Sequence, residues 1–284
     1  MLALSLGLAA ALIWAVHDLL ARKLSQGAAL LPIIIVVIGS GSVALVGPSL
    51  AFGNWQGLSI QAISLAVAAG FAYALASGTL FRAFSMAPAR IVAPIIGAYP
   101  MLSLASAVLQ ERPVTAWEWL SVLAIIAGIA VVSVTGQKGA DEQSKSALPA
   151  MGWSALSACG FAATFAIGQE AARQGSELPM ILITRLTALF LITVLFLAYR
   201  SSFQSLRGNW LIICAMGLFD AVALSLVTLS GNLPFAEYAA IASSLFGVVT
   251  IVLASYFLNE KLRPVQWLGV AIVFSGIGFL SAQG

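Results

Sequence analysis

Four ionisable residues, His17, Asp18, Arg185 and Asp220, lie within long apolar stretches of the sequence. An ionised side chain surrounded by hydrocarbon is costly, and such residues commonly bind a charge, carry a proton or pair with one another. Asp18 precedes Arg22 by one helical turn, a spacing that favours an ordinary ion pair near an interface. Arg185 lies close to the start of its stretch, so its long side chain can reach the surface.

Asp220 differs from these because it lies near the centre of its stretch, too deep for a short side chain to reach water. A lone carboxyl at that depth is a functional candidate. We expect it either to exchange a proton or to remain ionised and bind the amino group of a solute. A hydrogen-bonded structural role is the third interpretation.

Aromatic side chains supply a second chemistry. Trp14 lies on a stripe of small and polar residues spaced by three and four positions, namely Gly7, Ala10, Ala11, His17 and Asp18. Such a stripe does not suit lipid, so Trp14 either lines a cavity or packs against another helix. Other predicted helices carry Tyr73, Ser77, Tyr99, Phe161, Phe165 and Tyr238. Rings of this kind hold flat apolar groups by stacking and cations through their π-faces.

Pro88, Pro94 and Pro100 recur every six residues at the fourth predicted helix. Proline lacks a backbone N–H and bends a helix, which a membrane tolerates where polar groups or water satisfy the freed carbonyl. We expect Pro94 to expose backbone to a cavity, and a purely structural bend is the alternative.

Motifs of known catalytic sites are absent from the sequence. There is no GxSxG or HExxH, and Cys159 and Cys214 are isolated within apolar stretches. The glycines of IIIVVIGSGSVA (33–44) resemble a dinucleotide-binding turn, but the acidic residue needed about 20 positions later is missing. We therefore expect no enzyme activity, no cofactor and no metal.

Composition indicates which solvent surrounds these residues. Hydrophobic residues make up 61% of the 284 positions, charged residues 8%, and the mean hydropathy is +1.03. Soluble domains have about 45–50% and about 25%, so most side chains here face lipid or each other. The net charge of +3 is spread over short breaks between apolar stretches, which indicates orientation in a membrane and not nucleic-acid binding.

Those breaks divide the chain into ten stretches, each long enough to cross a core of about 30 Å as a helix of about 20 residues. The stretches lack the alternation of barrel strands, so the sequence predicts an all-α integral membrane protein with ten transmembrane helices. Residues 136–149, GQKGADEQSKSALP, are predicted to be a flexible linker. The predicted helices cover 3–21, 30–52, 59–81, 89–109, 116–135, 150–170, 179–199, 209–230, 235–257 and 265–282.

Two segments of the chain read alike. VLQERPVTAWEWL around Glu111 and FLNEKLRPVQWLG around Glu260 each pass from an apolar stretch through an acid, a base and a proline to a new apolar stretch. Small residues seven positions apart follow both, at Ser121 and Gly128 and at Gly269 and Gly276, where another helix can approach closely. The chain is therefore predicted to contain two five-helix halves, 1–135 and 150–284. Because five is odd, the halves are inverted, as is typical of secondary transporters.

With these features the chain resembles the drug/metabolite transporter superfamily, and within it the EamA-type ten-helix transporters. The resemblance is carried by the LIW of the first helix, the proline and alanine that open helices four and nine, and the acid–base–proline turn after each. A narrower likeness is to bacterial aromatic amino acid exporters of the YddG type. The resemblance implies a central cavity formed by helices 1, 3, 4, 6, 8 and 9, with helices 5 and 10 in support.

We expect a monomeric secondary transporter of the bacterial inner membrane that exports amino acids, aromatic or otherwise apolar, and related small metabolites by alternating access. Efflux of cationic aromatic compounds and a non-transporting membrane scaffold are the alternatives. The expected partners are a small-molecule substrate and the lipid bilayer. The expected substrate-binding residues are Trp14, His17, Tyr73, Ser77, Pro94, Tyr99, Phe161, Phe165, Asp220 and Tyr238.

The distribution of basic residues predicts the orientation. With ten spans, the loops on one side hold ten of the 13 Lys and Arg residues, the other side holds Arg112 and Arg173, and Arg185 lies within a span. The positive-inside rule then places the 136–149 linker in the cytoplasm and both termini in the periplasm.

Overall fold

The computed structural model describes residues 2–99, 108, 114–134, 144–206, 208–259 and 263–283. These residues form helices and turns, with no strand among them. The helices are α1 (Leu2–Leu24), α2 (Leu30–Phe52), α3 (Ile60–Met86), α4 (Ala89–Ile96), α6 (Ala116–Val134), α7 (Ser144–Gln174), α8 (Glu177–Ala198), α9 (Trp210–Leu229), α10 (Glu237–Ser243), α11 (Phe246–Phe257) and α12 (Pro264–Gln283), with 3-10 turns at Phe203–Leu206 and Ser230–Asn232.

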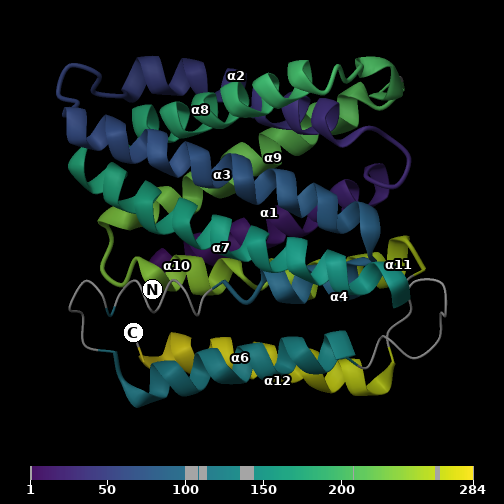
Figure 1. The fold of residues 1–284 in the computed structure, drawn as a ribbon. Coiled ribbons are helices and arrows are strands. Elements are labelled where there is room, and N and C mark those ends of the chain that lie inside the picture. Colours follow the sequence, from purple (N-terminus) through teal and green to yellow (C-terminus); the bar gives the residue numbers. More distant parts are fainter. Residues whose placement is uncertain are drawn as a thin grey trace.

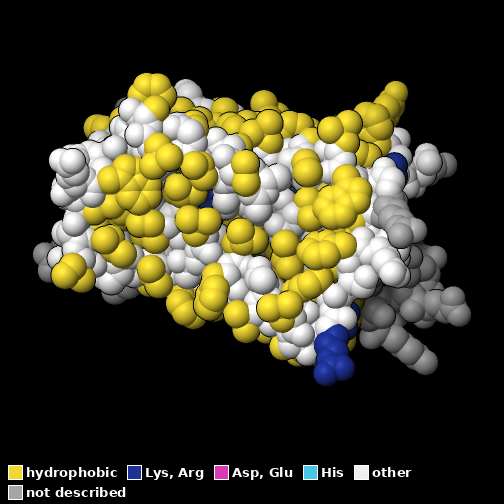
Figure 2. Space-filling view, turned by 90° about the horizontal axis from the view of Figure 1, so that it is seen from above, with side chains coloured by type: hydrophobic (Ala, Val, Ile, Leu, Met, Phe, Trp, Pro, Cys, Tyr) yellow, Lys and Arg dark blue, Asp and Glu magenta, His cyan; other side chains and the backbone are white. Residues whose placement is uncertain are grey.

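The outside of the molecule is apolar and its polar residues face inward. Within the described residues, seven helical segments are long and apolar enough to cross a membrane, and Ala116–Gly128 is a shorter apolar one. Figure 2 shows hydrophobic side chains spread over one face, with charged side chains sparse. Arg185 and Asp220, in contrast, are buried. This inverted distribution is the one that a lipid solvent requires.

The helices pack into a bundle in which the later half of the chain contacts the earlier half (Figure 1). Helix α3 packs against α7 and α8, and α2 packs against α8 and α9. Helix α1 contacts α9, α10 and α11. Helices α6 and α12 pack against each other at one side of the bundle, where α6 also contacts α4, and the N- and C-termini lie at the same end of the bundle.

Most predicted spans match the helices, but the linker prediction is partly wrong. The range predicted for the second span, 30–52, is that of α2. Helix α7, however, begins at Ser144 and includes Pro149, so residues 144–149 are helical and not part of a flexible linker. Ser, Lys, Ala and Leu are all compatible with a helix, and polarity alone led to the loop prediction. Residues 136–143, Glu111 and Glu260 lie outside the described residues.

The fourth predicted helix is not continuous. The prediction covers 89–109, but α4 ends at Ile96 and a turn at residues 97–99 follows; Val108 is again helical, and the rest of 100–109 lies outside the described residues. Pro94 lies within the last turn of α4, where it cannot donate a helical hydrogen bond. Pro100, which is outside the described residues, disfavours the helical conformation for Tyr99. The helical conformation is therefore interrupted at residues 97–99.

The ninth predicted helix, 235–257, is interrupted as well. Ser244 and Leu245 separate α10 from α11. The hydroxyl groups of Ser243 and Ser244 donate to the carbonyls of Ala240 and Ile241, at 3.0 and 2.7 Å. Serine hydroxyls that bond to nearby carbonyls compete with the helical ladder. Interrupted helices inside a membrane bundle commonly bind solutes or ions at the break.

Small residues allow the close helix crossings, as the repeat predicts. A side chain at Gly276 of α12 would contact Ile125 and the carbonyl of Ser121 on α6. This confirms the expected approach of α6 and α12 at Gly276. On α3, a side chain at Gly70 would meet Thr184 and Thr187 of α8.

Gly70→Ala is expected to destabilise the fold by about 1–3 kcal/mol because the added methyl group overpacks a tight crossing. Gly78 lies two turns later on the same helix, and a methyl group at that position would have no other atom within 4 Å. Gly78→Ala should therefore be neutral or slightly stabilising. Detergent or thermal unfolding of the two variants measures the difference, and equal stability would show that the crossing tolerates a side chain.

Candidate functional site

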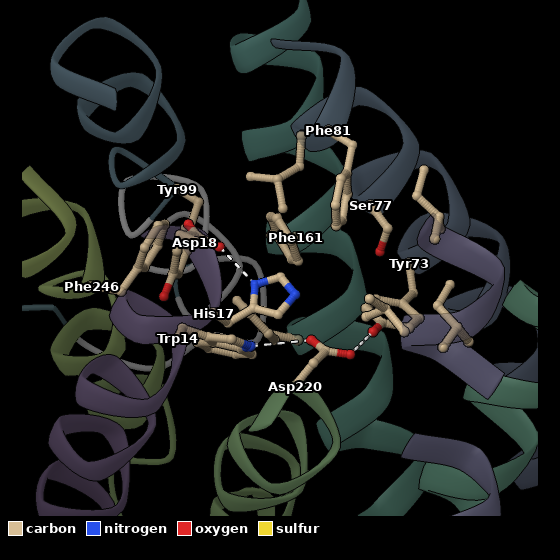
Figure 3. Close-up of a pocket in the computed structure, with 15 residues that line it drawn as sticks. Trp14, His17, Asp18, Tyr73, Ser77, Phe81, Tyr99, Phe161, Asp220 and Phe246 are labelled. Carbon is tan, nitrogen blue, oxygen red and sulfur yellow. Dashed lines mark hydrogen bonds and ion pairs between the residues drawn. The ribbon is translucent and has the colours of Figure 1, made fainter. Parts of the chain in front are cut away.

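A small pocket lies between the helices of the bundle (Figure 3). Helices α1, α2, α3, α7, α9 and α11 and the turn after α4 all contribute side chains to it. The lining consists of Trp14, His17, Asp18, Ile34, Val37, Ile38, Tyr73, Ser77, Leu80, Phe81, Tyr99, Phe161, Phe165, Asp220 and Phe246.

One wall of the pocket is aromatic and is built around Trp14. Its ring centroid lies 5.6 Å from that of Phe165 and 6.4 Å from those of Phe161 and Phe246. Tyr99 extends the wall, with centroid distances of 5.1 Å to Phe165 and 6.4 Å to Phe246. These separations are within the range in which rings attract one another, and each pair adds about 0.5–1.5 kcal/mol beyond burial. The wall is therefore both cohesive and suited to a flat apolar group.

A buried ion pair borders the pocket. Nη1 of Arg185 on α8 donates to Oδ2 of Asp220 on α9 at 2.7 Å. The same carboxylate accepts a hydrogen bond from Tyr73 Oη, and its Oδ1 accepts from Trp14 Nε1 at 3.2 Å. Nη2 of Arg185 donates to the carbonyl of Ile38 at 3.3 Å. Asp220 is thus ionised, balanced by a guanidinium and fully hydrogen-bonded.

A second polar group, His17 with Asp18, lies on α1. Nδ1 of His17 is 2.9 Å from Oδ1 of Asp18. Because a carboxylate only accepts, Nδ1 carries the hydrogen. The ring packs edge-on against Phe81, with centroids 6.1 Å apart. Among the described residues, Nε2 of His17 has no hydrogen-bond partner. Figure 3 shows the ring in the middle of the pocket, with Ser77 and Tyr73 on the side away from Asp18.

The pocket is almost filled by its own side chains. About 460 Å³ lies between its atoms, but only about 20 Å³ admits the centre of a water molecule. A water needs about 10–15 Å³ by that measure, so the space holds one or two waters. A solute of amino-acid size can enter only if the aromatic side chains or the helices that carry them move apart.

The chain matches one family model twice. Residues 1–134 and 148–282 both match the EamA-like transporter family. The chain belongs to this family. A solved structure titled only "Crystal structure of protein" is similar to the chain, with a TM-score of 0.78 and 17% sequence identity over 99% of this chain and 96% of that one. At that identity the likeness shows the fold alone. No curated protein matches the chain.

Membership in the EamA-like family makes this chain a membrane transporter of small solutes. The central pocket of this family member combines most of the residues that the sequence singles out. Eight of the ten predicted binding residues line it: Trp14, His17, Tyr73, Ser77, Tyr99, Phe161, Phe165 and Asp220. Their convergence from several helices and one turn agrees with the cavity that the resemblance implies. Helix α2 also lines the pocket, which the resemblance does not imply.

Two predicted residues are placed elsewhere in this EamA-family chain. Pro94 is buried in the last turn of α4 and is not part of the pocket lining. Tyr238 on α10 stacks on Phe235, with centroids 5.3 Å apart, and donates from its hydroxyl to Glu118 Oε1 at 3.2 Å. It therefore joins α10 to α6. The side chain of Tyr238 points toward Glu118 because of this hydrogen bond between two helices, and helical periodicity gives no information about such a bond.

Two predicted partnerships are also wrong. Arg185 does not reach the surface, because its side chain is 0% exposed. Asp220 is consequently not a lone carboxyl. Asp18 pairs with His17, and Nη1 of Arg22 donates to the carbonyl of Phe84 at 2.7 Å. The partners of Arg185 and Arg22 lie on other helices, and the partner of Asp18 is the adjacent residue. The i,i+4 rule for pairs within one helix predicts neither kind of contact.

Sequence reasoning also missed several lining residues. Asp18, Phe81 and Phe246 border the pocket but are not among the predicted binding residues. Phe81 lies one turn beyond Ser77 on the same face of α3, so helical spacing could have identified it. Phe246 opens α11 directly after the interruption, and no pattern in the sequence indicates where that interruption falls.

Proposed function

We propose that this EamA-family chain is a ten-helix, monomeric secondary transporter of the bacterial inner membrane that exports amino acids with aromatic or other apolar side chains. The observation that carries the proposal is the central pocket, where an aromatic wall faces the carboxylate and imidazole of α1. A flat apolar side chain suits the wall by stacking. An amino group suits the Asp18 carboxylate and the free acceptor on His17.

Alternating access by an inverted repeat is part of the proposal, and equivalent helix crossings support it. Gly70 of α3 lies against Thr184 of α8, and Gly217 of α9 lies against Val37 of α2. Gly217 follows Gly70 by 147 positions, and Thr184 follows Val37 by the same 147 positions. Each residue of one crossing therefore has its counterpart, from the other half of the chain, in the second crossing. Such a pair of equivalent contacts is expected of inverted repeats around a central site.

The helix starts of the outer pair repeat in the same way. At α6, Oε2 of Glu118 accepts from the backbone N–H of Thr115 at 2.8 Å. At α12, Oε1 of Gln266 accepts from the backbone N–H of Arg263 at 2.6 Å. Both are the carboxyl or amide half of a capping box. The two family matches, one in each half, support the same division at the linker.

Efflux of cationic aromatic compounds is the second candidate, and the charge of the pocket favours it. The described lining residues include Asp18 and Asp220 but neither Lys nor Arg. Arg185, which does not line the pocket, is already paired with Asp220. The carboxylate of an amino acid would thus find only hydroxyl donors such as Ser77, whereas an aromatic cation would find cation–π partners and an acid.

Transport of two probes distinguishes these candidates. Purified protein in liposomes would be given labelled phenylalanine or labelled phenyltrimethylammonium, at equal pH on both sides. Saturable uptake of phenylalanine supports amino acid export, and uptake of the cation alone supports the second candidate. A membrane scaffold would move neither probe above the rate of protein-free liposomes, and that result would contradict the proposal.

The proposed orientation places both termini in the periplasm. Fusions of alkaline phosphatase, which is active only in the periplasm, are expected to be active at the C-terminus and inactive in the 136–149 linker, because ten of 13 basic residues fall on the linker side. Green fluorescent protein fusions serve as the reciprocal control. An inactive phosphatase at the C-terminus of a stably inserted chain would reverse the orientation.

A further inference from the structure

The polar pair on α1 has a nitrogen that can bind a proton as well as the amino group of a solute. Nε2 of His17 is buried, has no hydrogen-bond partner among the described residues, and lies at the centre of the pocket. Its other ring nitrogen is held by Asp18 at 2.9 Å. A buried nitrogen left without a hydrogen-bond partner is unfavourable. The position of Nε2 therefore suits a group that binds to it reversibly.

The charges around His17 define what that group can be. Among the described residues, the titratable groups that share the pocket with it are Asp18 on α1, Asp220 on α9, Tyr73 on α3 and Tyr99 after α4, and Arg185 on α8 lies behind Asp220, to which it is paired. Helices α7 and α11 present phenyl rings there. Because Arg185 and Asp220 cancel each other, the described lining has one uncompensated negative charge, that of Asp18, while the imidazole is neutral.

We propose that His17 and Asp18 form a site at which one proton is exchanged for the cationic group of the solute. With a proton on Nε2, the imidazolium balances Asp18 and both ring nitrogens are donors, so a second cation is repelled. Without it, Nε2 is an acceptor beside a carboxylate, and an ammonium group is attracted. Proton and solute therefore occupy the same site in turn.

Exchange of this kind couples export to proton entry. The proton leaves Nε2 when the solute's cationic group binds, and returns from the opposite side of the membrane after the solute dissociates. No bond of the solute changes, and one positive charge replaces another. The inference rests on the proposed transport function and specifies its driving ion.

The coupling is tested with a proton gradient across liposomes that contain the protein. Labelled phenyltrimethylammonium is suitable because it is a monocation that cannot lose a proton. With the membrane potential clamped at zero and the lumen one pH unit more acidic, a one-for-one exchange should accumulate the probe about tenfold, since a proton ratio of ten is worth 1.4 kcal/mol. Accumulation that stays at unity while the probe still crosses at equal pH would overturn the inference and leave the transport function intact. A probe that does not cross at all, together with immobile phenylalanine, would remove the transport function and this inference with it.

Variants identify the site. His17→Gln retains hydrogen-bonding capacity but cannot titrate, so the ratio of probe inside to outside that it reaches should fall from about tenfold to one, whatever its initial rate of uptake. Asp18→Asn should weaken uptake of the probe. Glu170→Gln is the matched control, because Glu170 is an acid on the surface of α7, 39% exposed, and its loss should leave accumulation at the wild-type level. Wild-type accumulation by His17→Gln would place the proton elsewhere.

A spectroscopic test does not depend on any variant folding. His17 is the only histidine in the 284 residues, so ¹⁵N-histidine labelling gives the signal of this ring alone. At a fixed pH at which Nε2 is protonated, phenyltrimethylammonium should convert the Nε2 signal to that of a bare nitrogen and release about one proton per protein. A bound probe that leaves the signal unchanged would overturn the proposal.

Discussion

Replacing Arg185 by methionine is expected to destabilise the folded protein by about 3–5 kcal/mol, the usual cost of leaving one member of a buried ion pair without its partner. Asp220 would keep its hydrogen bonds from Trp14 and Tyr73 but lose its counter-charge. The loss can be measured as the fraction of folded protein after extraction, or by unfolding in mixed detergent micelles.

The double variant R185M/D220N is the decisive control. It removes both charges and retains one amide oxygen, which can accept from Trp14, while the amide N–H can donate to the Tyr73 hydroxyl. Replacing both partners of a buried pair by uncharged groups is often neutral, so the double variant should be more stable than R185M. If the double variant is no more stable than R185M, the packing of the Arg185 side chain, and not the balance of charge with Asp220, holds α8 against α9.

Replacing Trp14 by alanine should raise the apparent KM for transported solute about 5–30-fold, because the lost ring contacts are worth about 1–2 kcal/mol in total. The indole contacts three phenyl rings and donates to Asp220 at 3.2 Å. Trp14→Phe keeps an aromatic surface and loses only the hydrogen bond, so its effect should be smaller. Initial rates of probe uptake, normalised to folded protein, measure both.

Trp210→Ala provides the matched control for Trp14→Ala. Trp210 begins α9 and is 44% exposed, which is typical of an interfacial tryptophan. Its removal should change the amount of inserted protein more than the KM. An unchanged KM in Trp14→Ala would mean that this ring packs helices and does not contact solute.

The helices were largely predictable from sequence because their length is fixed by the solvent. A run of about 20 apolar residues crosses the bilayer whatever its neighbours are, and α2, 30–52, matches its prediction. The ends of α4 and the break before α11 were not predictable. They depend on Pro94, Pro100 and two serine hydroxyls, each of which is also compatible with a continuous, bent helix.

The pocket residues were mostly predictable because helical spacing reports which residues share a face. Trp14 and His17 are three positions apart, as are small residues on the same stripe. The partners of those residues were not predictable. Arg185 and Asp220 are 35 positions apart on different helices, and a sequence pattern gives the depth of a charge in the membrane but not the helix that it faces.

The position of Arg185 also has a consequence for how the chain is made. The ribosome delivers α8 before α9, so the guanidinium emerges while its counter-charge is still unsynthesised. Exposing an arginine at a helix centre to lipid costs about 2.5–3.5 kcal/mol at insertion, although α8 is strongly apolar with Arg185 included, at a mean hydropathy of 2.4. Asp220 follows after the short connection between the two helices. Helix α8 is thus best accommodated if the translocon holds it until α9 arrives, and the two enter the bilayer as a hairpin with the ion pair already formed.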